Sequence, residues 1–324
     1  MIIREFAPVL IPALNRYEHL KKCLSSLAKN SHALDTVLYI ALDAPAREGH
    51  KDGYNKIVKY LNKISGFKKV IVIKRDKNFG VPGNVWKAQD YLFKKHDAII
   101  VSEDDNYFSP NFLDYMNKGL QIFKNRKDIF AICGYNYPIN IPLNYPYNFY
   151  LFRGAPGWGI GLWKNKHKNK DISVKSVKEF LKSYKNILNI IKKANYLLPH
   201  LFDMINKNLI AGDTAYSMNL VKNNMFCILP TISKVRNYGH DGSGVHCGST
   251  RKDVFKDQLI DNARYFDFSV PVNKVMENKE LNSAVQKRLG VSPPETFKRG
   301  LIFFARGTNL HEYYKKLRDI IKSV

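Results

Sequence analysis

The chain has 324 residues, of which 45% are hydrophobic and 13% aromatic. This is enough apolar surface for a large buried core and excludes a disordered or fibrous protein. Lysine and arginine outnumber aspartate and glutamate by 52 to 28, and the formal net charge of +24 predicts anionic partners: phosphorylated small molecules, nucleic acid or an anionic membrane surface. No apolar run reaches the length of a membrane span.

The cellular location is predicted from the cysteines and the first residues. The four cysteines are far apart in the sequence and form no Cys-x-x-Cys pair, which favours reduced thiols. The first residues lead directly into a predicted strand, so we expect no signal peptide. Together these features predict a cytoplasmic protein whose membrane contact, where it exists, is peripheral.

The first hundred residues alternate between short apolar runs and segments with helical spacing. The predicted strands cover residues 8–13, 36–42, 70–73 and 99–101, and the predicted helices cover 18–27, 54–64 and 84–93. Four such strand-and-helix units predict an α/β fold with a doubly wound, mostly parallel sheet and helices on both faces. A further helix is expected to end near residue 123 and a further strand to cover 129–134.

Three adjacent carboxylates, Glu103, Asp104 and Asp105, directly follow the fourth predicted strand. In an open α/β sheet, ligands bind beyond the carboxyl ends of the strands. Carboxylates at this density repel one another, so we expect a cation beside them. Mg²⁺ or Mn²⁺ takes oxygen ligands from one or two carboxylates and completes its shell with water and phosphate. For an isolated acidic triplet, a solvated loop is the alternative interpretation.

Other candidate residues lie after the remaining strands. Arg16 follows the first strand, Asp43 ends the second, and a basic loop rich in glycine and proline, residues 74–83, follows the third. Trp158 stands among glycines, where it is either part of the core beside a tight turn or a surface on which a sugar ring stacks. Asp213 opens a predicted helix, either as a structural N-cap or as a site residue.

Two basic regions have an apolar component. Residues 177–191 carry an apolar stripe with lysines on the other face, a pattern of both interfacial helices and helices packed on a core. The tail, residues 297–324, combines apolar and basic residues and indicates a peripheral anchor or a partner-docking helix, with core packing as the alternative. A loop of glycine and serine, residues 233–248, contains two histidines and is suited to ordering over a phosphate.

The order of these segments resembles the GT-A fold nucleotide-sugar glycosyltransferases, including family 2, and in particular the N-acetylglucosaminyltransferases of complex N-glycan processing. The matching segments span residues 5–250 and comprise 8–16, 42–43, 101–105 with 109–112, 156–159, 212–213, 232–233 and 244–246. The resemblance implies one GT-A domain with a nucleotide-sugar-binding half, residues 1–135, and an acceptor-binding half, residues 136–255. Residues 256–324 would form a C-terminal helical extension.

The resemblance also implies roles for individual residues. Asp105 would bind Mn²⁺ or Mg²⁺ together with His246, and Asp213 would be the general base. The residues expected to bind the donor are Arg16, Asp43, Asn78, Gly80, Glu103, Asp104 and Trp158. In that family the residue at Asp43 contacts the base and the one at Arg16 lies near the diphosphate.

These observations predict a metal-dependent, inverting glycosyltransferase. It would move a sugar from a nucleotide-diphosphate donor, a UDP-sugar, to a hydroxyl of a glycan or lipid-linked glycan in bacterial surface polysaccharide synthesis. A sugar nucleotidyltransferase is the alternative enzyme, although no early glycine-rich loop followed by arginine and lysine is present. A basic nucleic-acid-binding protein is the alternative from another class, although the sequence offers no recognisable nucleic-acid module, and we expect no nucleic-acid partner.

Overall fold

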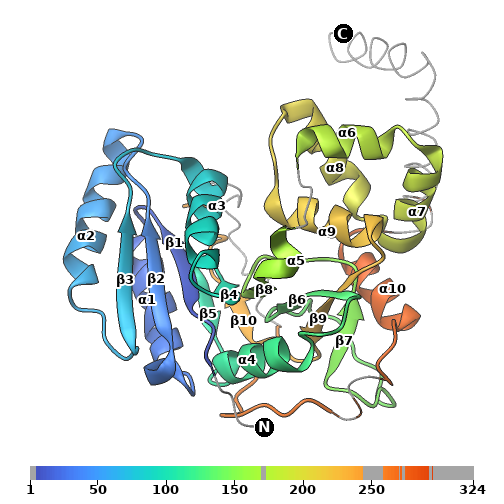
Figure 1. Ribbon diagram of the computed structural model, residues 1–324, viewed down its shortest axis with the longest axis horizontal. Helices are drawn as coiled ribbons and strands as arrows, with labels where there is room; N and C mark the ends of the chain where they lie inside the picture. Colours follow the sequence, from blue (N-terminus) through green and yellow to red (C-terminus); the bar gives the residue numbers. More distant parts are fainter. Residues whose placement is uncertain are drawn as a thin grey trace.

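An eight-stranded mixed sheet forms the centre of the molecule (Figure 1). The structure is a computed structural model that describes residues 5–168, 173–243, 258–269, 271, 274–291 and 294. In the order β3-β2-β1-β4-β8-β6-β9-β7, its strands are Lys69–Lys74, Val37–Leu42, Val9–Ala13, Ala98–Val101, Ile160–Trp163, Ile129–Cys133, Phe226–Pro230 and Phe149–Phe152. Two further short strands, β5 (Asn106–Phe108) and β10 (Val235–Asn237), form a separate antiparallel pair.

The first four strands of the sheet are parallel. Strand β1 pairs in parallel with β2 and β4, and β2 pairs in parallel with β3. Strand β8 then lies antiparallel to both β4 and β6, and β7 lies antiparallel to β9, whereas β6 and β9 are parallel. The predicted α/β fold with a mostly parallel sheet is therefore confirmed, and the antiparallel β7 and β8 are additions that the sequence pattern did not predict.

Helices cover both faces of the sheet, because side chains alternate along each strand. Val9 and Ile11 of β1 belong to the core shared with α1, α2 and α4, whereas Leu10 belongs to the core shared with α3, α9 and α10. The helices are α1 Tyr17–Ala28, α2 Lys51–Leu61, α3 Gly80–Phe93, α4 Phe112–Ile122, α5 Lys164–Lys168, α6 Val174–Leu181, α7 Tyr184–Ala194, α8 Leu197–Lys207, α9 Gly212–Lys222 and α10 Lys279–Arg288, with short 3₁₀ turns η1 Ala33–Asp35 and η2 Glu48–His50.

Three predicted helices differ from the observed ones. The helix predicted over residues 54–64 is α2, Lys51–Leu61, which begins and ends three residues earlier. Helix α3 begins at Gly80, four residues earlier than predicted, because Pro82 lies in its first turn, where a missing N–H costs no helical hydrogen bond. The single amphipathic helix predicted over residues 177–191 is two helices, α6 and α7, separated at Lys182 and Ser183. Consequently the side chains of that stripe do not share one face.

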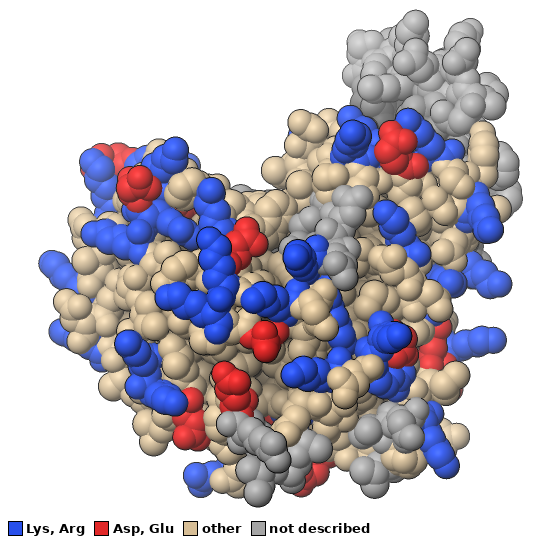
Figure 2. All heavy atoms as spheres, in the orientation of Figure 1, with Lys and Arg blue, Asp and Glu red and all other residues tan. Residues whose placement is uncertain are grey.

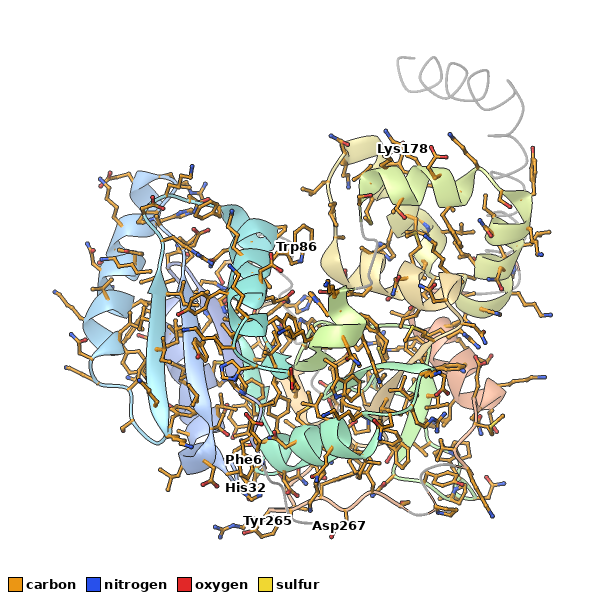
Figure 3. The ribbon with its side chains drawn as sticks, in the orientation of Figure 1. Phe6, His32, Trp86, Lys178, Tyr265 and Asp267 are labelled. Atoms are coloured by element: carbon orange, nitrogen blue, oxygen red, sulfur yellow. The ribbon has the colours of Figure 1, made fainter. Side chains whose placement is uncertain are left out.

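Residues 258–269 pack across α4 and the end of the sheet. Phe266 and Phe268, which belong to this segment, are buried in the core. Phe268 stacks on Tyr115 of α4 with 5.3 Å between the ring centroids. Figure 3 shows Tyr265 and Asp267 beside Phe6 and His32 at one edge of the molecule. This part of the chain beyond residue 255 therefore completes the core instead of standing apart from it.

In the described part of the chain, no helix is both long and apolar enough to cross a bilayer. The basic tail, residues 297–324, lies outside the described residues. The three cysteines that the structure describes, Cys23, Cys133 and Cys227, are buried free thiols, as their spacing predicted.

Candidate functional site

The carboxyl ends of three adjacent parallel strands bring the predicted site residues to one edge of the sheet. Strands β2, β1 and β4 are neighbours, and they are followed by Asp43, Arg16 and the acidic triplet. The chain stays in register just beyond the strands: the Asp43 N–H donates to the Ala13 carbonyl at 2.9 Å, and the Ser102 N–H donates to the Leu10 carbonyl at 3.1 Å. This is the edge where ligands bind in open α/β sheets.

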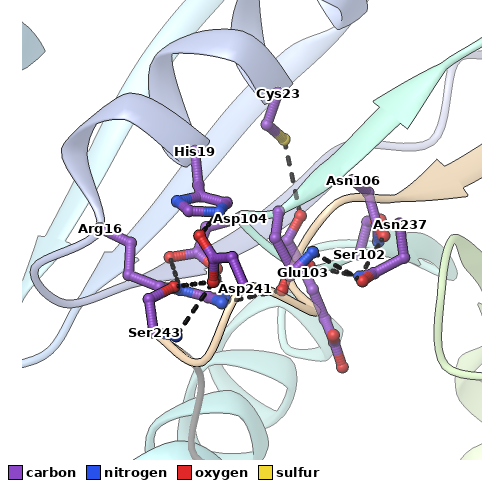
Figure 4. A network of polar contacts seen from close by, with 12 residues as sticks. Arg16, His19, Cys23, Ser102, Glu103, Asp104, Asn106, Asn237, Asp241 and Ser243 are labelled. Atoms are coloured by element: carbon purple, nitrogen blue, oxygen red, sulfur yellow. Dashed lines mark hydrogen bonds and ion pairs between the residues drawn. The ribbon is translucent and has the colours of Figure 1, made fainter. Parts of the chain in front are cut away.

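Arg16 bridges the two aspartates of the triplet, Asp104 and Asp105. Figure 4 shows its side chain beside Asp104. Its guanidinium contacts Asp104 through Nη2 and through Nε, the latter 3.4 Å from Oδ2, and its Nη1 lies 2.9 Å from Asp105 Oδ2. Burial alone would lower the pKa of Arg16, but the charges of Asp104 and Asp105 raise it above its usual value. Arg16 therefore places one positive charge directly beside the acidic triplet.

The β10 strand and the residue that follows it hold Asp105 from the other side. Asn237 Nδ2 donates to Asp105 Oδ1 at 2.7 Å, and the Tyr238 N–H donates to the Asp105 carbonyl at 2.9 Å. Gly239 passes so close that a Cβ on it would lie 2.0 Å from Asp105 Oδ2. The Asp105 carboxylate is therefore buried and fixed in orientation.

Glu103 points to the other side of the triplet and meets the loop after β7. Its Oε2 accepts a hydrogen bond from Trp158 Nε1 at 3.2 Å. Burial, together with the carboxylates of Asp105 and Asp104, raises the pKa of Glu103 to about 8. Burial also raises the pKa of Asp104 to about 6, although Arg16 opposes this shift. Burial is the largest cause of both shifts, because it disfavours the charged form of a carboxyl group, and three carboxylates here face the single guanidinium of Arg16.

Asp213 lies in the first turn of α9 with an exposed side chain. Its carboxylate is near enough to Glu103 to contribute to the raised pKa of that residue. Ser217 connects this turn to the tryptophan loop: its hydroxyl donates to the Asp213 carbonyl at 2.7 Å and accepts from the Ala155 N–H at 3.0 Å. The N-cap of α9 is Ala211, so Asp213 is not the structural cap.

Asp43, Asn78 and Gly80 form a second cluster at the ends of β2 and β3. The Asp43 carboxylate accepts hydrogen bonds from the backbone N–H groups of Ala44 and Phe79, both at 3.0 Å. Asn78 donates from Nδ2 to the Ala44 carbonyl at 2.6 Å and accepts from the Gly80 N–H at 3.1 Å. The three residues brace the entry into α3, and Asp43 is 4% exposed.

The acidic triplet has the chemistry to hold a divalent cation jointly with phosphate. In the described part of the chain, no group of three or more His, Cys, Asp or Glu side chains converges as a metal site. Two hard carboxylates, Asp104 and Asp105, are nevertheless adjacent and buried, which is the number of protein ligands that Mg²⁺ uses when substrate phosphates complete its shell. The other predicted ligand, His246, lies outside the described residues.

Sequence reasoning missed two side chains that shape this site, Asn237 and His19. Asn237 faces Asn106 across the β10–β5 pair, and strands of three residues separated by more than a hundred positions leave no periodic signal. His19 Nε2 lies 3.1 Å from Asp241 Oδ2 and joins α1 to the residues after β10. His19 stands one helical turn after Arg16, and this spacing could have identified it.

The fold and site define a class of protein: an α/β protein with a doubly wound sheet and a charged candidate site at the carboxyl edge of its strands. The model of the family "Glycosyl transferase family 2" matches residues 9–192, which is more than half of the chain. The chain belongs to glycosyl transferase family 2. No curated protein matches it significantly.

Several solved structures are similar to the chain. TarS of S. aureus has 14% sequence identity, with 52% of this chain and 30% of that chain covered and a TM-score of 0.34. TarS 1-349 in complex with UDP-GlcNAc has 16% identity, 74% and 61% coverage, and a TM-score of 0.36. The mannosyltransferase PcManGT from Pyrobaculum calidifontis, in complex with GDP-Man and Mn²⁺, has 9% identity, 56% and 53% coverage, and a TM-score of 0.35. The chain therefore spans from about a third to three fifths of these proteins.

Proposed function

We propose that this protein transfers a sugar from a nucleotide-diphosphate donor to a hydroxyl group of a glycan, with inversion at the anomeric carbon. The observation that carries the proposal is the buried Asp104 and Asp105 pair bridged by Arg16 at the carboxyl edge of the sheet. A site with both signs of charge can hold a diphosphate and its counter-cation. Membership of glycosyl transferase family 2 favours this reaction over nucleotidyl transfer and over nucleic-acid binding.

In the proposed mechanism, the acceptor hydroxyl attacks the anomeric carbon and the nucleoside diphosphate departs from the opposite face. Asp213 accepts the hydroxyl proton, because an alcohol is a poor nucleophile until its proton is transferred. Its exposed carboxylate can meet an incoming acceptor. With one base and no protein nucleophile, the reaction inverts the configuration.

Arg16 stabilises the negative charge that grows on the departing diphosphate. Its guanidinium is always charged and can contact two oxygens at once. A bound Mn²⁺ or Mg²⁺, held by Asp105 with Asp104 beside it, would supply further electrophilic stabilisation to the phosphates. Glu103 and Trp158, joined by their hydrogen bond, border the place of the donor sugar, and Asp43, Asn78 and Gly80 border that of the base.

The finer assignments follow from the sequence. We propose a UDP-sugar as the donor, carrying a hexosyl or N-acetylhexosaminyl group, because the segment order resembles N-acetylglucosaminyltransferases. Residues 1–135 would bind the donor and residues 136–255 the acceptor, a glycan or lipid-linked glycan of a bacterial surface polysaccharide. We further propose that the protein works in the cytoplasm, peripherally at the inner face of the plasma membrane. Within residues 256–324, first expected to be an associating extension, residues 258–269 and α10 pack on the core, so we assign the associating role to the basic tail, residues 297–324.

Calorimetric titration with UDP, GDP and other nucleoside diphosphates, with and without Mn²⁺, tests the donor site. We expect one nucleotide to bind in a Mn²⁺-dependent manner, and Asp105→Ala to abolish this binding because it removes the carboxylate proposed to hold the cation. Asp128→Ala is the matched control, because Asp128 also pairs with an arginine, Arg126, but lies before β6 at the opposite edge of the sheet. Binding of no nucleotide under any metal condition would refute the proposal.

A further inference from the structure

Arg16 occupies the carboxylate oxygens that a divalent cation needs. It contacts both oxygens of Asp104 through Nη2 and Nε, and its Nη1 lies 2.9 Å from Asp105 Oδ2. The remaining oxygen of Asp105, Oδ1, accepts from Asn237 Nδ2 at 2.7 Å. A cation that binds Asp105 through Oδ2 must therefore either share that oxygen with the like-charged guanidinium, which repels it, or displace one arm of Arg16.

The arginine cannot yield by losing its proton, because a guanidinium stays charged at every physiological pH. Its side chain is 17% exposed, against 9% and 5% for Asp104 and Asp105. Displacing it into a place without a new acceptor would leave a partly buried cation unpaired, which is costly. Cation binding at this site is thus opposed by the protein until another anion receives the guanidinium.

A diphosphate is such an anion, and it brings oxygens for both the arginine and the cation. We propose that Arg16 makes metal binding conditional on the donor: without a diphosphate it holds Asp104 and Asp105 and excludes the cation, and with one it turns to the phosphates and releases Asp105. This inference rests on the proposed function, because it assigns to Arg16 the coupling between the donor and its metal. By linkage, the metal must strengthen nucleotide binding by the same factor.

The positions around the arginine support a short movement instead of a rearrangement. Arg16 is the N-cap residue of α1 and has non-helical backbone angles, so its side chain can change direction without disturbing the helix. Gly239 lies against both Arg16 and Asp105: a Cβ on it would be 3.3 Å from Arg16 Nη1. Asp105 itself remains fixed by Asn237 and by the Tyr238 N–H.

The test is Mn²⁺ binding followed by electron paramagnetic resonance of the free ion, which needs no catalytic turnover. Wild type, Arg16→Gln and Arg16→Lys are titrated with Mn²⁺ alone, with UDP and with GDP. We expect Arg16→Gln to bind Mn²⁺ alone at least fivefold more tightly than wild type, and the tightening by nucleotide to shrink correspondingly. Arg16→Lys keeps the charge but loses the planar fork, and we expect it to lie between the two.

Arg126→Gln is the matched control. Arg126 also forms a two-point pair with an aspartate, Asp128, but at the opposite edge of the sheet, so its loss should leave Mn²⁺ affinity unchanged. If Arg16→Gln binds Mn²⁺ no more tightly than wild type, while wild type binds Mn²⁺ with a nucleotide, the inference on Arg16 is overturned and the proposed function stands. If neither protein binds Mn²⁺ under any condition, the metal-dependent function fails, and the inference with it.

Discussion

Asp213 and Asp105 show how two carboxylates of one candidate site differ in their surroundings. Asp105 is 6% exposed and held by a guanidinium, an amide and a close glycine, which suits the role of cation anchor that we propose for it. Asp213 is exposed on the first turn of α9, so it can exchange a proton with an arriving acceptor. The two side chains differ in exposure because Asp105 follows the buried strand β4, whereas Asp213 lies on the surface of the first turn of α9.

Replacing Asp213 with asparagine should slow sugar transfer without weakening donor binding. The amide keeps the shape of the side chain but cannot accept the proton, and loss of a general base lowers rates by about 10²–10⁴-fold. The turnover number and the calorimetric affinity for the nucleotide are measured together. Asp203→Asn, an exposed aspartate paired with Lys207 on the neighbouring α8, should change neither. Unchanged turnover in Asp213→Asn would remove this residue from the mechanism.

Gly239 should tolerate no side chain. An alanine Cβ would lie 2.0 Å from Asp105 Oδ2, so either the carboxylate or the backbone after β10 must move, at a cost of about 1–3 kcal/mol. We expect Mn²⁺-dependent nucleotide binding to weaken about tenfold or more. Gly49→Ala is the control, because a Cβ there meets nothing within 4 Å. Equal affinity in both variants would show that the loop after β10 does not set the position of Asp105.

The structural elements divide into those that the sequence predicts and those that it does not. Strands β1 to β4 were predictable because each is a short apolar run closed by polar or turn residues, and their parallel order placed Arg16, Asp43 and Asp105 at one edge before any coordinates. Strands β5 and β10 have three residues each and are stable only because they pair with each other. The position of Asn237 in the site therefore depends on tertiary pairing of β10 with β5, and hydrophobic periodicity in the sequence does not predict such pairing.

The segment of residues 258–269 is fixed to the core by a partly buried ion pair. Lys234, 1% exposed, contacts Asp261 Oδ2, to which Asn111 Nδ2 also donates at 2.9 Å. Burial alone would raise the pKa of Asp261, but the hydrogen bonds from Asn111 and Lys234 lower it below its usual value. Since Lys234 directly precedes β10, this pair connects the segment to the strand that holds Asp105.

Removing the Asp261 carboxylate should destabilise the protein and make that loss depend on pH. Asp261→Ala leaves Lys234 buried and unpaired, which costs about 3–5 kcal/mol at neutral pH. Because the folded-state pKa of Asp261 is below its unfolded value, the stabilisation is complete above pH ~4 and disappears as the pH falls through the folded-state pKa.

Urea unfolding of both proteins between pH 7 and pH 3 measures the effect. The difference in free energy of unfolding should narrow toward the acid end. Asp267→Ala, whose side chain is 90% exposed beside Lys118, should cost less than about 1 kcal/mol. A difference that stays constant down to pH 3 would show that the charge of Asp261 is not what stabilises the segment.

On the scale of the whole molecule, basic side chains spread over much of the face seen in Figure 2, including the surface of α3 and α6. Residues 174–194, which comprise α6, α7 and their junction, contain six lysines and a single glutamate, Glu179. Two large side chains of α7, Tyr184 and Leu188, are 52% and 56% exposed among them, and Lys178 points outward from α6 in Figure 3. Exposed apolar groups surrounded by lysines suit an anionic lipid surface.

The division of α6 from α7 changes what the sequence pattern means. Val177 and Phe180 of the predicted stripe are buried against the core, so the core-packing interpretation holds for α6. Tyr184 and Leu188 lie beyond the break, on a helix with its own orientation. Only these two side chains of the stripe remain available for the membrane contact we propose, and the contact must be shallow.

Sedimentation with lipid vesicles tests this surface. We expect the protein to bind vesicles rich in anionic phospholipid, to bind uncharged phosphatidylcholine vesicles far more weakly, and to dissociate in high salt, because each lysine near the surface contributes about 1 kcal/mol of screened attraction. Replacing both Tyr184 and Leu188 with serine should weaken binding severalfold. Leu34→Ser, which removes another exposed leucine, 74% exposed in η1, should not. If wild type and the double variant bind vesicles equally well, the binding is due to the net charge of +24, and Tyr184 and Leu188 of α7 have no role in membrane contact.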